Sequence, residues 1–258
     1  MMQNSTLQIK SLTDDSLSGL VITIAIVGFW LTSLVFLLPA SLAHVLWVWI
    51  GLAILGRTFL QTGLFVLAHD AMHMNLIPGS KRLNDWIGVL ALGLYACLPY
   101  NQCCRNHWKH HRYPAQVGDP DFHDGIHHHP VRWYLKFMRS YLSIRLLATW
   151  IISWGLIFLG LNQVGQISLV NFLLFWLVPL ALSSMQLFFF GTYLPHREQC
   201  QELNSSDRGQ PYCLLLWSFL TCYHFGHYHW AHHQYPQTPW YKLPIAHRFG
   251  AALSDAGR

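Results

Sequence analysis

Two long stretches of the chain contain no charged side chain. Residues 16–56 and residues 146–196 have no Asp, Glu, Lys or Arg. A helix needs about 20 apolar residues to cross the hydrocarbon core of a bilayer, so each stretch has room for two passes. Turns near Pro39 and at the polar residues 162–168 divide the stretches. The pattern predicts four membrane-spanning helices, near residues 19–39, 42–67, 146–161 and 168–192.

The remaining apolar segments are shorter. Residues 86–99 and 212–222 are predicted to form half-inserted or interfacial helices rather than full crossings. The second predicted span is expected to continue past the bilayer and to carry residues 69–73 out of it. Residues 1–18 are polar and lack the pattern of a signal peptide, so we interpret them as a short cytosolic tail. We expect one all-α integral membrane domain over residues 1–258.

The distribution of basic residues predicts the orientation. The turns at 39–42 and 162–168 contain no Lys or Arg. Most basic residues lie in the central segment or after the fourth span: Lys81, Arg82, Arg105, Lys109, Arg112, Arg132, Lys136, Arg139, Arg145, Arg197, Arg208, Lys242, Arg248 and Arg258. Basic residues accumulate on the cytoplasmic side of membrane proteins. We therefore expect both termini and the central segment in the cytosol.

The composition narrows the class of protein. The chain is 53% hydrophobic and 10% charged, whereas about 25% charged residues is usual in a soluble domain. Its 16 Lys and Arg residues are too few for a nucleic-acid-binding module, so no nucleic-acid partner is expected. None of the six cysteines forms a CxxC pair, and we expect all six to be reduced thiols. The 17 histidines, against 11 acidic residues, indicate metal held at a membrane.

Arg57 is an exception within the second predicted span. A charged residue at such a position faces a neighbouring helix, extends towards the interface, or lines a path for substrate. We expect one of the first two, structural, arrangements and keep the substrate path as the alternative.

The histidines cluster at one end of the predicted helices. An HxxxH motif follows the second span, one HxxHH motif lies in the central segment, another follows the last apolar segment, and a Leu-Pro-His sequence ends the fourth span. Helix positions i, i+3 and i+4 are neighbours, so imidazoles at these spacings reach one site. The predicted topology places all of them at the cytosolic end. The candidate metal ligands are His69, His73, His107, His110, His111, His196, His229, His232 and His233.

Nine neutral imidazoles suit first-row transition metals. One tetrahedral zinc needs only four ligands, so the number of histidines predicts two metal ions. The chain has too few glutamates for the glutamate-rich di-iron site of helical bundles. Of the other histidines, His224 and His227 are weaker candidates for ligands or for supporting residues. We expect His123 and His247 at the surface, residues 127–129 in a solvated turn, and His44 near the outer turn.

Three aspartates accompany these motifs. Asp70 lies inside the HxxxH motif, and Asp119 and Asp121 follow the first HxxHH motif. A carboxylate beside a ligating imidazole accepts its free N–H and fixes its tautomer, and we expect this supporting role in catalysis. An Asp-Pro-Asp sequence also forms a turn by itself, and that alternative stays open for Asp119 and Asp121.

The three motifs with about four membrane helices resemble the membrane di-iron oxygenases and desaturases. The flanking sequences narrow the resemblance to the bacterial and cyanobacterial β-carotene ketolases: FVLAHDAMH at 65–73, FGTYLPH at 190–196, WSFLTCYHFG at 217–226 and PWYKLP at 239–244. The similarity covers about residues 55–247. Three positions depart from the pattern of that family, since Met74 and Ala115 stand where glycine is usual and Ala231 stands where glutamate is usual.

The resemblance implies two iron ions, dioxygen and an external reductant. The implied reaction converts the C4 methylene of a β-ionone ring of β-carotene to a ketone, through two hydroxylations and loss of water, and yields echinenone or canthaxanthin. Without an evident redox motif of its own, the chain is expected to receive electrons from a ferredoxin-like partner. The basic residues expected to dock this donor are Lys81, Arg82, Lys109, Arg112 and Lys136.

The substrate is expected to reach the site from the membrane lipid. Apolar and aromatic residues near the motifs are the candidates for a channel: Leu64, Phe65, Leu94, Tyr95, Phe189 and Phe225. The alternative functions are a fatty-acyl desaturase or a carotenoid 3-hydroxylase on the same metal site. A metal transporter is disfavoured because it would need polar or acidic residues inside its spans, and residues 146–196 lack charged ones.

Overall fold

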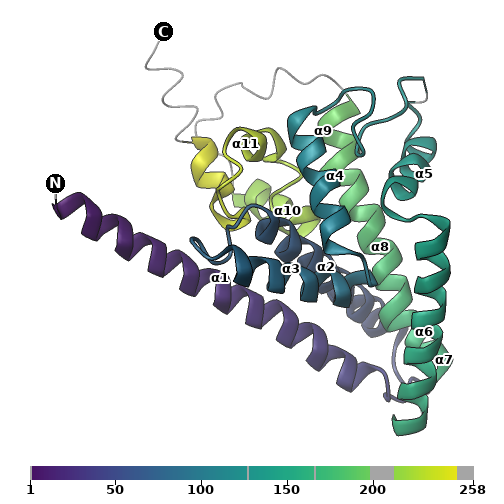
Figure 1. The fold of residues 1–258 in the computed structure, drawn as a ribbon. Helices are drawn as coiled ribbons and strands as arrows, with labels where there is room; N and C mark the ends of the chain where they lie inside the picture. The colour runs from purple at the N-terminus through teal and green to yellow at the C-terminus, as the bar shows by residue number, and fades with distance from the viewer. Residues whose placement is uncertain (1, 127, 166, 198–211, 249–258) are drawn as a thin grey trace.

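The computed structural model describes residues 2–126, 128–165, 167–197 and 212–248. Every regular element in these ranges is a helix (Figure 1). Four segments are long and apolar enough to cross a membrane: Asp14–Leu37 of α1 (Met2–Leu37), α2 (Trp47–Met72), α6 (Ile144–Gly165) and the run Leu169–Arg197. The all-α fold and the four predicted spans are confirmed. The boundaries differ, because α1 includes the predicted polar tail and α2 begins at Trp47 rather than near residue 42.

The last span consists of helical turns of alternating type. It comprises α7 (Leu169–Phe172), the π-helical η1 (Leu173–Leu177), α8 (Val178–Gln186), the π-helical η2 (Leu187–Tyr193) and α9 (Leu194–Arg197). The remaining elements are α3 (Lys81–Ala96), α4 (Tyr100–Arg112), α5 (Pro130–Tyr141), α10 (Tyr212–Cys222), α11 (His229–Gln234) and the short 3-10 helix η4 (Trp240–Lys242). With 11 residues, α10 is not a candidate span, as predicted.

Helix α2 is the centre of the fold and packs against α1, α3 and α8. Inside this packing, the side chain of Gln61 accepts a hydrogen bond from the Trp30 indole at 2.7 Å and donates one to the carbonyl of Tyr95 at 2.5 Å. A buried polar group with all partners in place specifies one arrangement of its helices. The end of α2 that carries the HxxxH motif is thereby held in a defined position.

Arg57 joins α2 to α1 and to η1 of the last span. Its side chain is buried, and the guanidinium donates to the carbonyls of Phe175 at 2.9 Å and Trp30 at 2.8 Å and to the Ser33 hydroxyl at 2.9 Å. Phe175 lies in η1, where π-helical winding interrupts the α-helical hydrogen-bond ladder. The structural interpretation of Arg57 is confirmed.

Helices α3 and α4 meet at an angle of 101°. Cys97 ends α3 in the left-handed conformation, with φ 52°, and Pro99 precedes α4. Gly88 makes room for the bend, because a Cβ atom there would lie 2.2 Å from the ring of Tyr100. The bend brings α4, with the first HxxHH motif, against α2. Figure 1 shows α4, α9 and α11 gathered at one end of the bundle.

Four of the predicted thiols are free cysteines: Cys97, Cys103, Cys104 and Cys222. Cys200 and His127 lie outside the described residues, as do Glu198 and Glu202, and the side chain of Cys213 is not described. The prediction of reduced thiols is therefore confirmed for the four described side chains.

Candidate metal centre

The nine predicted ligands meet at one end of the bundle and form two groups. The first group contains His69, His73, His107, His111 and His232. The second group contains His110, His196, His229 and His233. Within each group, the potential ligand atoms all lie within 4.8 Å of one another.

Each HxxHH motif contributes to both groups. In α4 the outer histidines, His107 and His111, belong to the first group, and the middle one, His110, belongs to the second. Helix α11 has the opposite assignment, so that only its middle histidine, His232, joins the first group. Residues i and i+4 lie above one another on a helix, whereas i+3 is displaced to the side. Two such motifs that face each other therefore build two adjacent sites.

The ring nitrogens face each other closely. Four pairs of Nε2 atoms lie 2.6–3.2 Å apart: His73–His107, His111–His232, His110–His233 and His196–His229. Two nitrogens that bind one ion, each at about 2.0–2.1 Å, are separated by about 3 Å. The observed spacing therefore fits a shared ion in each group.

Burial favours the neutral, metal-binding form of most of these rings. Burial, followed by repulsion from His111, lowers the pKa of His73 to about 3. Burial and the neighbouring rings also lower the pKa of His229 and of His232 well below the usual value. At His110 burial also acts to lower the pKa, but the neighbouring Asp121 and Asp119 raise it overall. Neutral imidazole offers a nitrogen lone pair, and a buried set of such donors suits a first-row transition metal. The two groups are thus compatible with a metal site.

Asp119 orients one of these rings. Its buried Oδ2 atom accepts hydrogen bonds from His110 Nδ1 at 2.9 Å and from the backbone N–H of Ala115 at 3.0 Å. Its Oδ1 atom accepts from the backbone N–H of Asp121 at 2.8 Å. Burial alone would raise the pKa of Asp119, but these hydrogen bonds and the neighbouring His110 lower it overall. A carboxylate that receives the Nδ1 proton leaves the Nε2 lone pair of His110 directed into the second group. The Asp-Pro-Asp sequence makes the predicted turn as well as this contact.

Asp121 lies beside the ring of His110 without a hydrogen bond to it, since its Oδ2 atom is 4.0 Å from Nδ1. Its Oδ1 atom instead accepts a hydrogen bond from the Tyr141 hydroxyl at 2.6 Å. Burial raises the pKa of Asp121 and raises that of Tyr141 well above the usual value. Sequence reasoning missed Tyr141, because it stands 20 residues from Asp121 in a helix with no motif.

Asp70 joins the HxxxH motif to the C-terminal segment. Its Oδ2 atom accepts a hydrogen bond from the backbone N–H of Trp240 at 3.2 Å. Its Oδ1 atom lies 3.7 Å from Nδ1 of His69, which is too far for a hydrogen bond. The side chain is completely buried. Asp70 therefore contacts one candidate ligand and anchors η4 beside it.

The other histidines lie outside the two groups. His224 is bonded to the Ser218 hydroxyl at 2.6 Å, and neither it nor His227 belongs to a group. His44 is exposed in the turn between α1 and α2, and His247 is half-buried. The surface prediction for His123 is wrong. Its side chain is 5% exposed, because the loop before α5 folds its ring against Phe122 and the buried Trp133.

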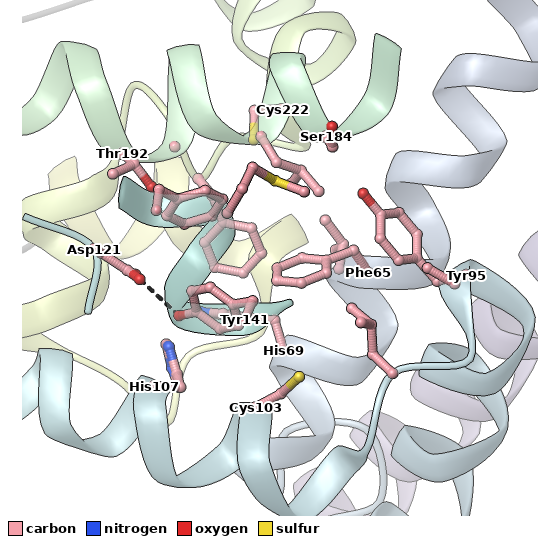
Figure 2. Close-up of a pocket in the computed structure, with 18 of the residues that line it drawn as sticks. Phe65, His69, Tyr95, Cys103, His107, Asp121, Tyr141, Ser184, Thr192 and Cys222 are labelled. Carbon is pink, nitrogen blue, oxygen red and sulfur yellow. Dashed lines mark hydrogen bonds between the residues drawn. The ribbon is translucent and has the colours of Figure 1, made fainter. Parts of the chain in front are cut away.

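An apolar cavity of about 330 Å³ adjoins the histidines (Figure 2). Its walls come mainly from α2, α4, α5, α8 and η2, and His107, His110, His229, His232 and His233 form part of them. Phe65, Tyr95 and Phe225 line the cavity, as expected. Leu64, Leu94 and Phe189 do not, because their side chains point into helix packing or to the exterior.

Part of the cavity wall comes from two candidate spans. Trp150 of α6 and Leu177, Ala181 and Met185 of the last span belong to this part. Ala181 and Met185 are exposed, and the side chains of α6 are mostly exposed. Helices of this length and composition are surrounded by lipid in a membrane. The cavity wall therefore includes side chains that also belong to the outer surface of these candidate spans.

Two of the three residues that depart from the pattern implied by the resemblance lie at strained backbone positions. Met74 has φ 61° and Ala115 has φ 57°, the left-handed region in which glycine has no steric cost. Glycine, the residue that the resemblance implies at both positions, is thus the residue that the backbone favours there. Ala231 is 7% exposed within α11, and nothing in the structure explains this substitution.

Fold and site together define a helical membrane protein with a histidine-rich centre suited to metal. The family model of the fatty acid desaturases matches residues 43–257, and the chain belongs to this family. Among its relatives, a protein named beta-carotene ketolase from Paracoccus sp. (strain PC1) is 39% identical over 92% of this chain and 96% of its own length. The zeaxanthin 4-ketolase of Chlamydomonas reinhardtii is 36% identical over 90% of this chain.

A beta-carotene ketolase of Haematococcus lacustris is 37% identical over 81% of this chain. The two algal proteins are longer, and the matched regions cover 52% and 64% of their lengths. No solved structure matches the chain. The resemblance to the β-carotene ketolases, first noted in the sequences around the histidine motifs, is confirmed by these relatives.

Proposed function

We propose that this protein is a membrane oxygenase that converts the C4 methylene of β-ionone rings of β-carotene to a ketone. The names of the relatives support this activity over the fatty-acyl desaturase and carotenoid 3-hydroxylase alternatives. The observation that carries the proposal is the apolar cavity that joins the histidines to the exposed side of α8. Through it, the terminal ring of a rod-like substrate reaches the site while its chain stays in apolar surroundings.

The nine histidines are the proposed ligands of two iron ions, one in each group. When bound, iron with dioxygen and external electrons would supply the oxidising power for the allylic C–H bonds at C4. The protein itself fixes the positions and orientations of the ligating imidazole rings. Asp119 orients His110, and the carbonyl of Thr192 accepts a hydrogen bond from Nδ1–H of His196 at 2.6 Å. Asp70 and Asp121 support the site through the contacts described above.

The electron donor is proposed to be a ferredoxin-like protein that binds the exposed face of α4. This face carries Arg105, Lys109 and Arg112, a charge pattern that attracts an acidic partner. The Trp108 ring is 45% exposed on the same helix and lies 5.0 Å from the ring of His73. Lys136, which was predicted to dock the donor, is not included in this face, because its ammonium group donates hydrogen bonds to the carbonyls of residues 119 and 120.

The orientation is part of the proposal. The two connecting turns lack basic residues, whereas the central segment is rich in them. This distribution supports a cytosolic location for both termini and the metal centre. A soluble donor such as a ferredoxin would then reach α4 directly, and the substrate would approach from within the bilayer.

The test is expression of the chain in a bacterium that produces β-carotene. We expect echinenone and canthaxanthin to accumulate, and purified protein to contain two iron ions per chain. His232→Ala should abolish ketone formation, whereas His44→Ala, which changes an exposed histidine in the turn between α1 and α2, should not. Formation of 3-hydroxy carotenoids alone would favour the hydroxylase, and new double bonds in membrane lipids would favour the desaturase.

A further inference from the structure

A carboxyl–phenol pair lies in the wall of the cavity, beside the histidines. The Tyr141 hydroxyl donates to Asp121 Oδ1 at 2.6 Å, and both side chains line the cavity together with His107 and His110 (Figure 2). The Oδ2 atom of Asp121 is 4.0 Å from Nδ1 of His110. The pair is therefore a polar feature of the cavity wall that adjoins a proposed iron ligand.

The pair has unused hydrogen-bond acceptors but no hydrogen that is free to be donated. The phenolic hydrogen is directed to Asp121, and the Nδ1 proton of His110 is directed to Asp119. Asp121 Oδ2 and the oxygen of Tyr141 accept no hydrogen bond from the described residues. A carboxylate and a phenol oxygen in this state can accept a hydrogen bond from a hydroxyl group.

We propose that Asp121 and Tyr141 bind the hydroxyl group of the C4 alcohol, and so retain this first oxidation product for the second oxidation. The inference rests on the proposed function. The alcohol remains at the same carbon that was oxidised, so its hydroxyl group lies near the histidines. A hydroxyl group without a partner in an apolar cavity is unfavourable, and this pair supplies the partner.

The same chemistry releases the final product. A ketone only accepts hydrogen bonds, and the pair has no free hydrogen to donate. The cavity is therefore selective for the alcohol over both β-carotene, which has no polar group, and the ketone. Retention of the intermediate and release of the product follow from a single property, the excess of acceptors.

A second polar pair in the cavity serves as a comparison. The hydroxyl groups of Tyr134 and Ser184 lie 2.6 Å apart, and Figure 2 shows Ser184 away from Asp121 and His107. Tyr134 is on α5, as is Tyr141, and it also lines the cavity. Tyr134→Phe therefore removes a similar phenol from the same helix without changing the carboxylate.

The first test measures binding to metal-free protein by quenching of tryptophan fluorescence. For the wild type, 4-hydroxy-β-carotene should bind about three- to tenfold more tightly than echinenone, which corresponds to one hydrogen bond. Asp121→Leu should remove or invert this preference, because it deletes the acceptors and frees the Tyr141 hydroxyl to donate to a ketone. Tyr141→Phe should weaken the preference, and Tyr134→Phe should leave it unchanged. An unchanged preference in both Asp121→Leu and Tyr141→Phe would overturn the proposal.

The second test measures products. Asp121→Leu and Tyr141→Phe should release the alcohol, and the ratio of 4-hydroxy to 4-keto carotenoid should rise at least threefold over that of the wild type and of Tyr134→Phe. A wild-type ratio in both variants would also overturn the proposal, even if ketone forms normally. Absence of any C4 product from the wild type would instead refute the proposed function, and the binding comparison would still report whether the pair recognises the alcohol.

Discussion

Replacement of Asp119 by asparagine tests whether this carboxylate sets the chemical state of the metal centre. The substitution keeps the size of the side chain but exchanges one oxygen for an NH2 group. At the position of Oδ2, the NH2 group would face two donors, His110 Nδ1–H at 2.9 Å and the backbone N–H of Ala115 at 3.0 Å. A favourable contact with His110 requires its proton to move to Nε2. That nitrogen faces His233 at 3.0 Å and would then no longer be available to a metal.

The expected loss of metal affinity follows from these contacts. Loss of a residue that orients a metal ligand typically costs about 10–100-fold in metal affinity, and the second group has only four histidines. The backbone N–H of Ala115 would also lose its acceptor, which costs about 1–3 kcal/mol for a buried donor. Rotation of the amide by half a turn would return an oxygen to His110 and Ala115 and place the NH2 group against the N–H of Asp121. A neutral amide oxygen is still a weaker acceptor for His110 than the carboxylate, so metal affinity falls in either rotamer. We expect about one iron per chain after mild chelation, against two in the wild type.

The assay is the iron content of purified protein after dialysis against increasing chelator, together with thermal unfolding in detergent. The matched control is Asp85→Asn, which changes an exposed aspartate that pairs with Lys81 on α3. This variant should keep the wild-type iron content at every chelator concentration, because surface ion pairs contribute little. The role of Asp119 in orienting His110 would be refuted if Asp119→Asn bound two iron ions and lost them at the same chelator concentration as the wild type.

Three further predictions concern backbone room and the route of the substrate. Gly88→Ala should destabilise the protein by about 1–3 kcal/mol, because its Cβ would lie 2.2 Å from an aromatic ring of α4. Gly93→Ala should stabilise the protein by about 0.5–1 kcal/mol, because no atom lies within 4 Å of the added Cβ. Equal shifts of the thermal unfolding midpoint in the two variants would contradict this reasoning. Ala115→Gly should raise stability by about 0.5–1 kcal/mol, because it relieves a positive φ; a lower unfolding midpoint would disprove the strain. Ala181→Trp should raise the KM for carotenoid several-fold with unchanged iron content, whereas Leu182→Trp, on α8 but outside the cavity wall, should not; an equal KM in the two variants would exclude this route.

Local sequence patterns were sufficient to predict the membrane helices and the set of histidines. An uncharged stretch long enough to cross a bilayer has few other structures available, because every backbone polar group must be satisfied within the segment. This constraint is local, so the spans could be read along the chain. Helical spacing is local as well, which is why the eight histidines of the three motifs could be named, together with His196. The sequences around them, at 65–73 and 239–244, narrowed the relatives to the ketolases.

The partition of the histidines between two groups was decided by tertiary structure. His110 and His232 have the same middle position in their motifs, yet they belong to different groups. That difference depends on how α4 and α11 face each other, which no periodicity reports. Only the positions of Asp119 and of the Thr192 carbonyl show how His110 and His196 are oriented.

The cavity was likewise decided by packing between distant segments. Leu64 and Phe65 are neighbours in α2, but only Phe65 lines the cavity, because adjacent helical residues face different partners. His123 is buried because Trp133, ten residues later, folds back over the loop. Tyr141 reaches Asp121 because the chain between them folds back and brings α5 against the loop that carries Asp121. Hydrophobicity and spacing along one segment specify which residues can enter a membrane or share a helix face, whereas a contact between segments requires the three-dimensional arrangement of both.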